Sequence, residues 1–83
     1  MLLGDKMHLR IRDLREDHDL TQTDLAKVLN CSQQTYSRYE NGDITINIES
    51  LITLANFYNT SIDYLVGITD IKEAYKKNII KHK

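Results

Sequence analysis

The chain has 83 residues, a hydrophobic fraction of 41% and a formal net charge of −1, which fit one small globular domain and exclude a disordered chain. It has no apolar run near the ~18 residues of a membrane span, no apolar stretch typical of a signal peptide, and too few cysteines for a disulfide framework. We therefore expect a cytoplasmic protein without a cofactor, a metal or a membrane partner. The near-neutral charge weighs against nucleic-acid binding, for which a basic pI is usual.

The first helix is predicted over residues 7–17, because Ile11 and Leu14 continue an apolar stripe that begins at residue 7. The charged residues of this segment, Arg10 among them, are expected to cover the solvent face. Residues 1–6 precede the helical pattern, and we interpret them as an N-terminal extension.

The second helix has an explicit start at Thr21, which is followed three residues later by Asp24. This pair resembles a capping box, in which each side chain bonds the backbone N–H of the other residue. The apolar positions that follow predict an end near Leu29. Asn30 favours a tight turn, because asparagine is among the residues, after glycine, that best tolerate a left-handed backbone.

The third helix is predicted over residues 33–40, after Ser32, which is a favourable N-cap, and before the stop signal of residues 41–42. Tyr36 and Tyr39 lie three residues apart on one side of it. The opposite face is polar and mostly uncharged, and it consists of Gln33, Gln34, Ser37 and Arg38.

The fourth helix is predicted to begin after Asn47, and the fifth spans residues 62–66 between a cap at residues 60–61 and Gly67. From Asp70 onwards, another capping-box pattern followed by apolar residues at helical spacing is compatible with a sixth helix. The fourth helix carries a broad apolar stripe, formed by Ile48, Leu51, Ile52, Ala55 and Tyr58 and widened by Leu54 and Phe57.

The second and third helices have the properties that a helix-turn-helix requires. Both are short, and three or four residues centred on Asn30 join them. Ala26 is small enough to let the following helix cross closely. Leu25, Leu29 and Tyr36 are apolar enough to hold the two helices at a fixed angle. The outer face of the third helix then offers side chains that can hydrogen-bond to base edges.

The stretch LTQTDLAKVLNCSQQTYSRYENG, residues 20–42, closely resembles the Cro/repressor-like (XRE-type) helix-turn-helix family. The resemblance covers residues 7–67 and includes the SIDYL stretch of residues 61–65. It implies an all-α, compact five-helix domain of the lambda-repressor-like type, which binds operator DNA as a dimer. On this basis, residues 7–67 form the helix-turn-helix domain and residues 68–83 form a basic C-terminal helix or tail.

The resemblance and the chemistry of the third helix together indicate how DNA is bound. The N-terminal part of a recognition helix points into the major groove, where Gln33 and Gln34 can bond adenine and Arg38 can bond guanine or a phosphate. By resemblance, Gln22 bonds a phosphate and braces Gln33. Neutral hydrogen bonds to the sugar-phosphate backbone are expected from Ser32, Thr35, Ser37 and Asn41.

The resemblance also implies an internal ion pair between Arg15, late in the first helix, and Glu40, at the end of the third. Arg15 is then structural and does not count among the cations that face DNA. Removing one partner of a buried pair typically costs about 3–5 kcal/mol, because the other charge is left uncompensated.

Two features depart from the pattern of the family. The loop of residues 43–46 lacks the basic residues that are common in relatives, so contacts from this loop to phosphate are doubtful. Its residues Ile44 and Ile46, which we expect to be exposed, suit a protein contact such as a dimer interface. Tyr36 fills a position that is usually aliphatic, so its hydroxyl needs a partner or a route to the surface.

Other residues of reactive types favour ordinary structural roles. Cys31 has no second thiol to pair with, and the histidines His8, His18 and His82 lack metal-ligand spacing. The lysine-rich segment of residues 72–83 fits a solvated face as well as a role in dimerisation or phosphate contact. The chain shows no nucleophile–base pair and no glycine-rich phosphate loop, so we expect no enzyme and no small-molecule substrate.

We predict a sequence-specific DNA-binding transcriptional regulator, a repressor that binds a pseudo-palindromic operator in double-stranded DNA as a homodimer through the third helix. Repression is favoured over activation because 83 residues leave no room for a separate activation domain. The alternative is an antitoxin or adaptor-type protein-interaction module on the same fold, with weak or secondary DNA binding. The polar face of the third helix favours the first function, whereas the apolar loop and the acidic segment of residues 41–70 favour the second.

Overall fold

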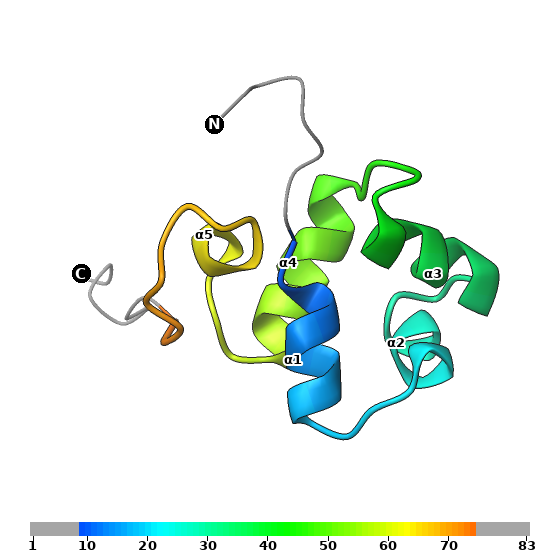
Figure 1. Ribbon diagram of the computed structural model, residues 1–83, viewed down its shortest axis with the longest axis horizontal. Helices are drawn as coiled ribbons and strands as arrows, with labels where there is room; N and C mark the ends of the chain where they lie inside the picture. The colour runs from blue at the N-terminus through cyan, green and yellow to red at the C-terminus, as the bar shows by residue number, and fades with distance from the viewer. Residues whose placement is uncertain (1–8, 75–83) are drawn as a thin grey trace, which may run out of the picture.

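The computed structural model describes residues 9–74, and all regular structure within them is helical. This confirms the predicted all-α, five-helix fold. The helices in chain order are α1 (Ile11–Asp17), α2 (Gln22–Val28), α3 (Gln33–Asn41), α4 (Ile48–Phe57) and α5 (Ile62–Leu65). In Figure 1, α1 and α4 occupy the centre of the view, with α2 and α3 on one side and α5 on the other.

The hydrophobic core receives side chains from every helix, which explains why such short helices are stable together. Tyr36 at the centre of α3 is fully buried, and so are apolar side chains of the other four helices. The largest buried side chains are Tyr36, Ile11, Leu14, Leu25, Leu54 and Leu65. This shared core fixes α2 and α3 relative to the rest of the domain.

The predicted start of α2 is confirmed in detail. The Thr21 hydroxyl accepts a hydrogen bond from the backbone N–H of Asp24 at 3.1 Å, and the Asp24 carboxylate accepts one from the backbone N–H of Thr21 at 2.9 Å. Helix α2 ends at Val28, with Leu29 as its C-cap. Asn30 then adopts φ 56°, the left-handed conformation expected of it.

The other caps lie where the sequence predicts them. The Ser32 hydroxyl accepts from the backbone N–H of Thr35, Asn47 caps α4, and Ser61 caps α5. Helix α3 runs one residue beyond its expected end, and Gly42 then takes up a left-handed φ of 77°. Each of these helix starts is set by a capping side chain, and the end of α3 by a glycine that adopts a left-handed backbone, so local sequence identifies them to within a residue.

Helix α1 begins at Ile11, later than predicted. The backbone of Arg10 has φ −92° and ψ 15°, and its N–H donates to the carbonyl of Leu65 at 2.9 Å. This long-range bond holds the chain against α5 before the helix starts. Met7, the residue at which the prediction began, lies outside the described residues.

The prediction that Arg10 covers the solvent face is wrong. Its guanidinium lies 4.3 Å from the centre of the Tyr64 ring and donates to the carbonyls of Tyr64 and Thr69, at 3.2 and 2.6 Å. It also forms a 2.7 Å ion pair with Asp70. Arg10 therefore joins α1 to α5 and to the segment that follows α5.

The first residues of the predicted sixth helix, 70–74, are not helical. The Asp70 carboxylate, which would cap that helix, is bound by Arg10 instead. The carbonyl of Lys72 accepts a hydrogen bond from the Thr60 hydroxyl, so this segment lies along the domain. The rest of the predicted helix falls outside the described residues.

The expectation that the apolar residues of the loop after α3 are exposed is wrong. Ile46 is only 8% exposed and belongs to the core, and Ile44 packs against it, so neither is the exposed contact predicted for the loop. In α4 the buried face consists of Leu51, Leu54, Ala55 and Tyr58. At 100° per residue, Ile48 and Ile52 project beyond one edge of that face and Phe57 beyond the other, and all three are exposed.

Candidate nucleic-acid interface

Helices α2 and α3 meet through a tight turn. The backbone N–H of Cys31 donates to the carbonyl of Ala26 at 2.9 Å, and the left-handed residue Asn30 reverses the chain between them. Ala26 is buried, and its small side chain permits this close approach. Leu25 and Tyr36 are completely buried beneath the turn, so the angle between α2 and α3 is fixed by packing.

The outer face of α3 is open to solvent and polar. Gln33, Gln34 and Arg38 are exposed, Ser37 is partly buried, and Tyr39 on the opposite side is buried. A shallow open depression is lined by Gln33, Gln34, Ser37 and Arg38. The residues predicted to read DNA therefore form one continuous surface on α3.

The amide of Gln33 is held in place by α2. Gln33 Nε2 donates to Gln22 Oε1 at 2.8 Å, which is the brace that the resemblance implied. Gln22 Nε2 in turn donates to Glu40 Oε1 at 3.1 Å. Because the oxygen of Gln22 faces Gln33 and its nitrogen faces Glu40, a chain of hydrogen bonds runs from the end of α3 back to its beginning.

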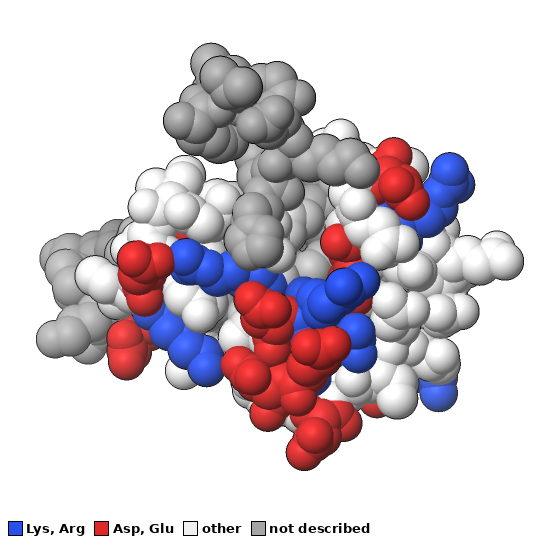
Figure 2. Space-filling view, in the orientation of Figure 1, with Lys and Arg blue, Asp and Glu red and all other residues white. Residues whose placement is uncertain are grey.

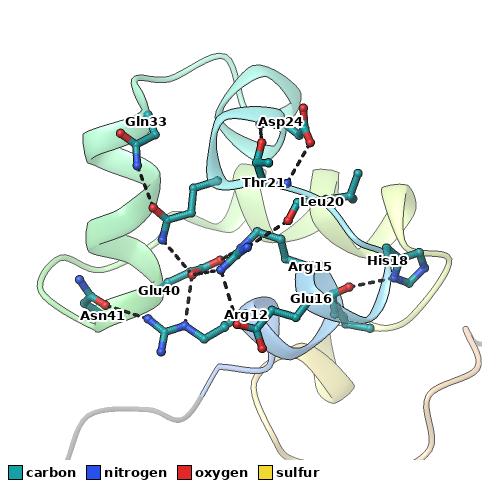
Figure 3. Close-up of polar contacts among 12 residues, drawn as sticks. Arg12, Arg15, Glu16, His18, Leu20, Thr21, Asp24, Gln33, Glu40 and Asn41 are labelled. Carbon is teal, nitrogen blue, oxygen red and sulfur yellow. Dashed lines mark hydrogen bonds and ion pairs between the residues drawn. The ribbon is translucent and has the colours of Figure 1, made fainter.

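The ion pair between Arg15 and Glu40 is present. Arg15 Nε and Nη2 donate to the two carboxylate oxygens at 2.7 and 3.2 Å, and Arg15 Nη1 donates to the carbonyl of Leu20 at 3.0 Å. The Glu40 side chain is 0% exposed. Figure 3 shows Glu40 of α3 at the point where contacts from α1 and α2 converge.

The surroundings of Glu40 favour its charged form. Burial raises the pKa of Glu40, but the hydrogen bonds from Arg15 and Gln22 outweigh burial and hold that pKa below its ordinary value. The hydrogen bond to Glu40 raises the pKa of Arg15. The carboxylate is therefore an ionised acceptor around which three helices are arranged.

Two buried tyrosine hydroxyls lie close to this ion pair. Burial raises the pKa of Tyr36 far above its ordinary value and the pKa of Tyr58 to about 12, and the negative charge of Glu40 raises both further. Within residues 9–74, neither hydroxyl forms a hydrogen bond of ordinary geometry. The side-chain interaction of Tyr36 with Glu40 nonetheless raises the pKa of Tyr36 and lowers that of Glu40, which makes the Glu40 carboxylate the partner that this hydroxyl was expected to need.

The family model for helix-turn-helix proteins matches residues 11–65, which contain all five helices. The chain belongs to this helix-turn-helix family. This is the Cro/repressor-like family that the sequence resembles. Its members include transcriptional regulators.

Three curated proteins illustrate the similarity. The uncharacterized HTH-type transcriptional regulator YobD of Bacillus subtilis is 36% identical over 61 residues, covering 74% of this chain and 54% of YobD. The cryptic phage CTXphi transcriptional repressor RstR of Vibrio cholerae is 38% identical over 72 residues, covering 84% of this chain and 65% of RstR. Antitoxin PezA of Streptococcus pneumoniae is 31% identical over 80 residues, covering 88% of this chain and 51% of PezA.

A solved structure supports the same fold. The crystal structure of a transcriptional regulator from Listeria innocua matches with a TM-score of 0.69 and 31% identity, over 86% of this chain and 64% of that one. This chain therefore spans about half to two thirds of the length of these relatives.

Two hydroxyls at the start of the helix-turn-helix recognition helix are already paired with each other. Ser32 Oγ donates to Thr35 Oγ1 at 3.0 Å and accepts from the backbone N–H of Thr35. The Ser32 hydroxyl is thereby occupied in capping α3, whereas the proton of the Thr35 hydroxyl is available to another acceptor.

Sequence reasoning missed Arg12. This α1 side chain is 51% exposed; its Nε donates to Glu40 Oε1 at 3.4 Å and its Nη2 donates to Asn41 Oδ1 at 3.2 Å. It therefore lies at the C-terminal end of the recognition helix of the helix-turn-helix. Nothing near Arg12 in sequence signals this, since its partners are 28 and 29 residues away.

Few cations are available to meet phosphates near the helix-turn-helix. Arg15 is held in its ion pair and Arg10 against α5. The other Lys and Arg side chains of residues 9–74 are exposed: Arg12, Lys27, Arg38 and Lys72. Figure 2 shows that acidic side chains gather over α1, whereas the side formed by α2 and α3 is mostly neutral.

The environments of Cys31 and His18 indicate structural roles for both residues. Burial raises the pKa of the Cys31 thiol, which keeps it protonated and unreactive at neutral pH. His18 Nδ1 lies 2.8 Å from the carbonyl of Leu14, and its ring packs against Tyr58. Within residues 9–74, no group of His, Cys, Asp and Glu could hold a metal ion, and no helix is long and apolar enough to span a membrane.

Proposed function

We propose that this protein is a sequence-specific DNA-binding transcriptional repressor that inserts α3 into the major groove of a pseudo-palindromic operator. The observation that carries the proposal is the exposed polar face of α3, on which the amide of Gln33 is fixed by Gln22. A solvated helix face does not require a fixed amide, whereas base readout depends on one.

The contact between Gln33 and Gln22 selects the atoms that Gln33 presents to a base. One N–H of Gln33 is used by Gln22 Oε1, which leaves Gln33 Oε1 and the second N–H for a ligand. An acceptor and a donor side by side match N6 and N7 of adenine. Gln34 and Arg38 lie next to it on the same face, where Arg38 suits guanine or a phosphate.

The DNA backbone is bound mainly through neutral donors in this proposal. The residues assigned to it are Gln22, Thr35, Ser37 and Asn41. Ser32, also predicted for this role, uses its hydroxyl to cap α3 and to donate to Thr35. Such contacts fix the register of α3 without reading sequence. Because few cations surround the helix-turn-helix, few counterions are released, and the salt dependence of binding is shallower than for a strongly basic repressor.

Homodimeric binding and repression complete the proposal. A two-fold dimer places two recognition helices about 34–36 Å apart, which matches half-sites one helical turn apart. Exposed apolar side chains of residues 9–74 supply surface for association; they are Ile48, Ile52, Phe57, Ile68 and Ile71. Repression is favoured because RstR, 38% identical, is a transcriptional repressor.

Titration of a fluorescent operator duplex, followed by light scattering of the complex, tests this function. The proposal expects binding that an unlabelled random duplex competes for poorly, and a mass of two chains on one operator. A protein that binds operator and random duplexes equally, or that stays monomeric both free and on DNA, contradicts it.

The second candidate is a protein-interaction module of the antitoxin type. The similarity to antitoxin PezA, 31% identical over 80 residues, favours it. The burial of Ile46 removes the apolar loop that also favoured it. Failure of the purified protein to bind any duplex, together with capture of a specific protein partner, would support this function over repression.

A further inference from the structure

Arg12 is the more exposed of the two arginines at the end of α3. Two arginines, Arg12 and Arg15, contact one carboxylate, Glu40. Arg15 makes the shorter contacts and is 14% exposed, whereas Arg12 makes a single 3.4 Å contact and is 51% exposed. Arg15, which also lies 4.0 Å from the exposed carboxylate of Glu16, binds Glu40 more closely than Arg12 does, and Arg12 remains a half-exposed cation.

The guanidinium of Arg12 has donors to spare and a fixed position. Its two described contacts, to Glu40 and Asn41, use two of the five N–H groups of a guanidinium. Asn41 accepts with its side-chain oxygen, which holds the Arg12 side chain at the last residue of α3. Figure 3 shows Arg12 and Asn41 together at the opposite end of α3 from Gln33.

The length of α3 places Arg12 at the wall of the groove. Eight residue steps separate Gln33 from Asn41, so their backbones are about 12 Å apart at 1.5 Å per residue. The N-terminal residues of a recognition helix contact the base edges, so an α3 inclined to the floor of the groove, which is about 8.5 Å deep, has its other end toward the phosphates at the rim.

We propose that Arg12 binds a backbone phosphate of the operator, as an anchor supplied by α1 at the C-terminal end of the recognition helix. This inference rests on the proposed function, because it takes α3 to be in the major groove. A phosphate fits the site because a planar guanidinium with free N–H groups binds phosphate oxygens through paired hydrogen bonds. Asn41 and Glu40 keep the guanidinium in place before DNA arrives.

The test compares Arg12→Gln, Arg12→Lys and the wild-type chain. Lys72→Gln is the matched control, because it removes the same charge from the segment after α5, on the other side of the molecule from α3 (Figure 1). Affinities for an operator duplex and for a random duplex are measured by anisotropy between about 50 and 200 mM salt. Urea unfolding of each variant establishes that it is folded.

For Arg12→Gln we expect similar fold-losses on both duplexes. The slope of log K against log salt should become shallower by about 0.9 per protomer, or about 1.8 per dimer. Arg12→Lys should keep the wild-type slope because it keeps the charge, and Lys72→Gln should also keep it.

Two results overturn the inference and leave the proposed function intact. One is a folded Arg12→Gln protein with the wild-type slope, whatever its affinity. The other is a loss confined to the operator, which would mean that Arg12 acts only by orienting the base-reading residues. Absence of DNA binding by the wild-type chain would instead contradict the proposed function itself.

Discussion

Arg15 on α1 and Glu40 on α3 are joined by two hydrogen bonds, one of 2.7 Å from Nε and one of 3.2 Å from Nη2. The same carboxylate accepts from Gln22, which accepts from Gln33. The ion pair that holds α1 to α3 therefore also supports the side chain that we assign to base readout. We therefore expect changes at Glu40 to affect both the stability of the fold and the proposed recognition of DNA.

Replacing Glu40 should destabilise the fold strongly. Glu40→Gln leaves the largely buried Arg15 with only a 4.0 Å ion pair to the exposed carboxylate of Glu16, so we expect a loss of roughly 3–5 kcal/mol in the free energy of unfolding. A domain of this size has a total stability of only about 4–12 kcal/mol. Urea unfolding measures the loss, with Glu49→Gln in α4, an exposed carboxylate, as the control. A loss below about 1 kcal/mol would mean that the ion pair is not structural.

Acidification should weaken the fold through the same carboxylate. Because hydrogen bonds from Arg15 and Gln22 lower the pKa of folded Glu40 below its ordinary value of 4.5, the folded state binds this proton less readily than the unfolded state. The stabilisation is therefore fully present above the unfolded pKa and is lost as pH falls through the folded one. Urea midpoints measured between about pH 2 and pH 7 should fall on acidification in the wild type and fall less in Glu40→Gln. Parallel curves would assign the acid sensitivity elsewhere.

The glutamines of α3 should determine base preference. Gln33→Ala and Gln34→Ala should each lower operator affinity by about 1–3 kcal/mol and relax preference at one or two base pairs per half-site. Affinity for a random duplex should change much less. Anisotropy titrations that show equal losses on both duplexes would reassign these residues to backbone contacts.

Gln22 should act on base preference through Gln33. If the 2.8 Å contact fixes the Gln33 amide, Gln22→Ala should reduce discrimination at the base pair that Gln33 reads. The double variant Gln22→Ala/Gln33→Ala should then lose less than the sum of the single variants, because both changes remove one shared contact. Additive losses would show that Gln22 contributes only its own bond to the DNA backbone.

The turn between α2 and α3 should tolerate glycine but not alanine. Asn30 has a φ of 56°, so Asn30→Ala should cost roughly 1 kcal/mol or more, whereas Asn30→Gly should cost little. Thermal unfolding of the two variants gives the comparison. Equal stabilities of the alanine and glycine variants would contradict a turn held in the left-handed conformation.

The sequence predicts the helix boundaries that depend on neighbouring residues. The caps at Thr21, Ser32, Asn47 and Ser61 are all confirmed, since a capping side chain bonds a backbone N–H only a few residues away. The predicted start of α1 is wrong, because the true start is set by a hydrogen bond from the backbone N–H of Arg10 to the distant carbonyl of Leu65.

Packing between distant segments determines which apolar residues are buried, and the local sequence pattern does not reveal this. The broad apolar face of α4 contains more residues than the core accepts, so periodicity does not reveal that Ile52 is exposed. Conversely, Ile46 in a loop is buried because the chain returns across the core there. For the site, the face of α3 follows from helical spacing, whereas the position of Arg12 depends on contacts 28 and 29 residues away.

In the proposed function, α3 reads base sequence in the major groove. Selection of bound duplexes from a random pool with the purified protein tests this directly. We predict an enriched pseudo-palindrome with half-sites about 10–10.5 base pairs apart, containing positions whose preference is lost in Gln33→Ala. A pool that stays random, although the protein is folded and binds duplex DNA, would contradict sequence-specific recognition by this helix.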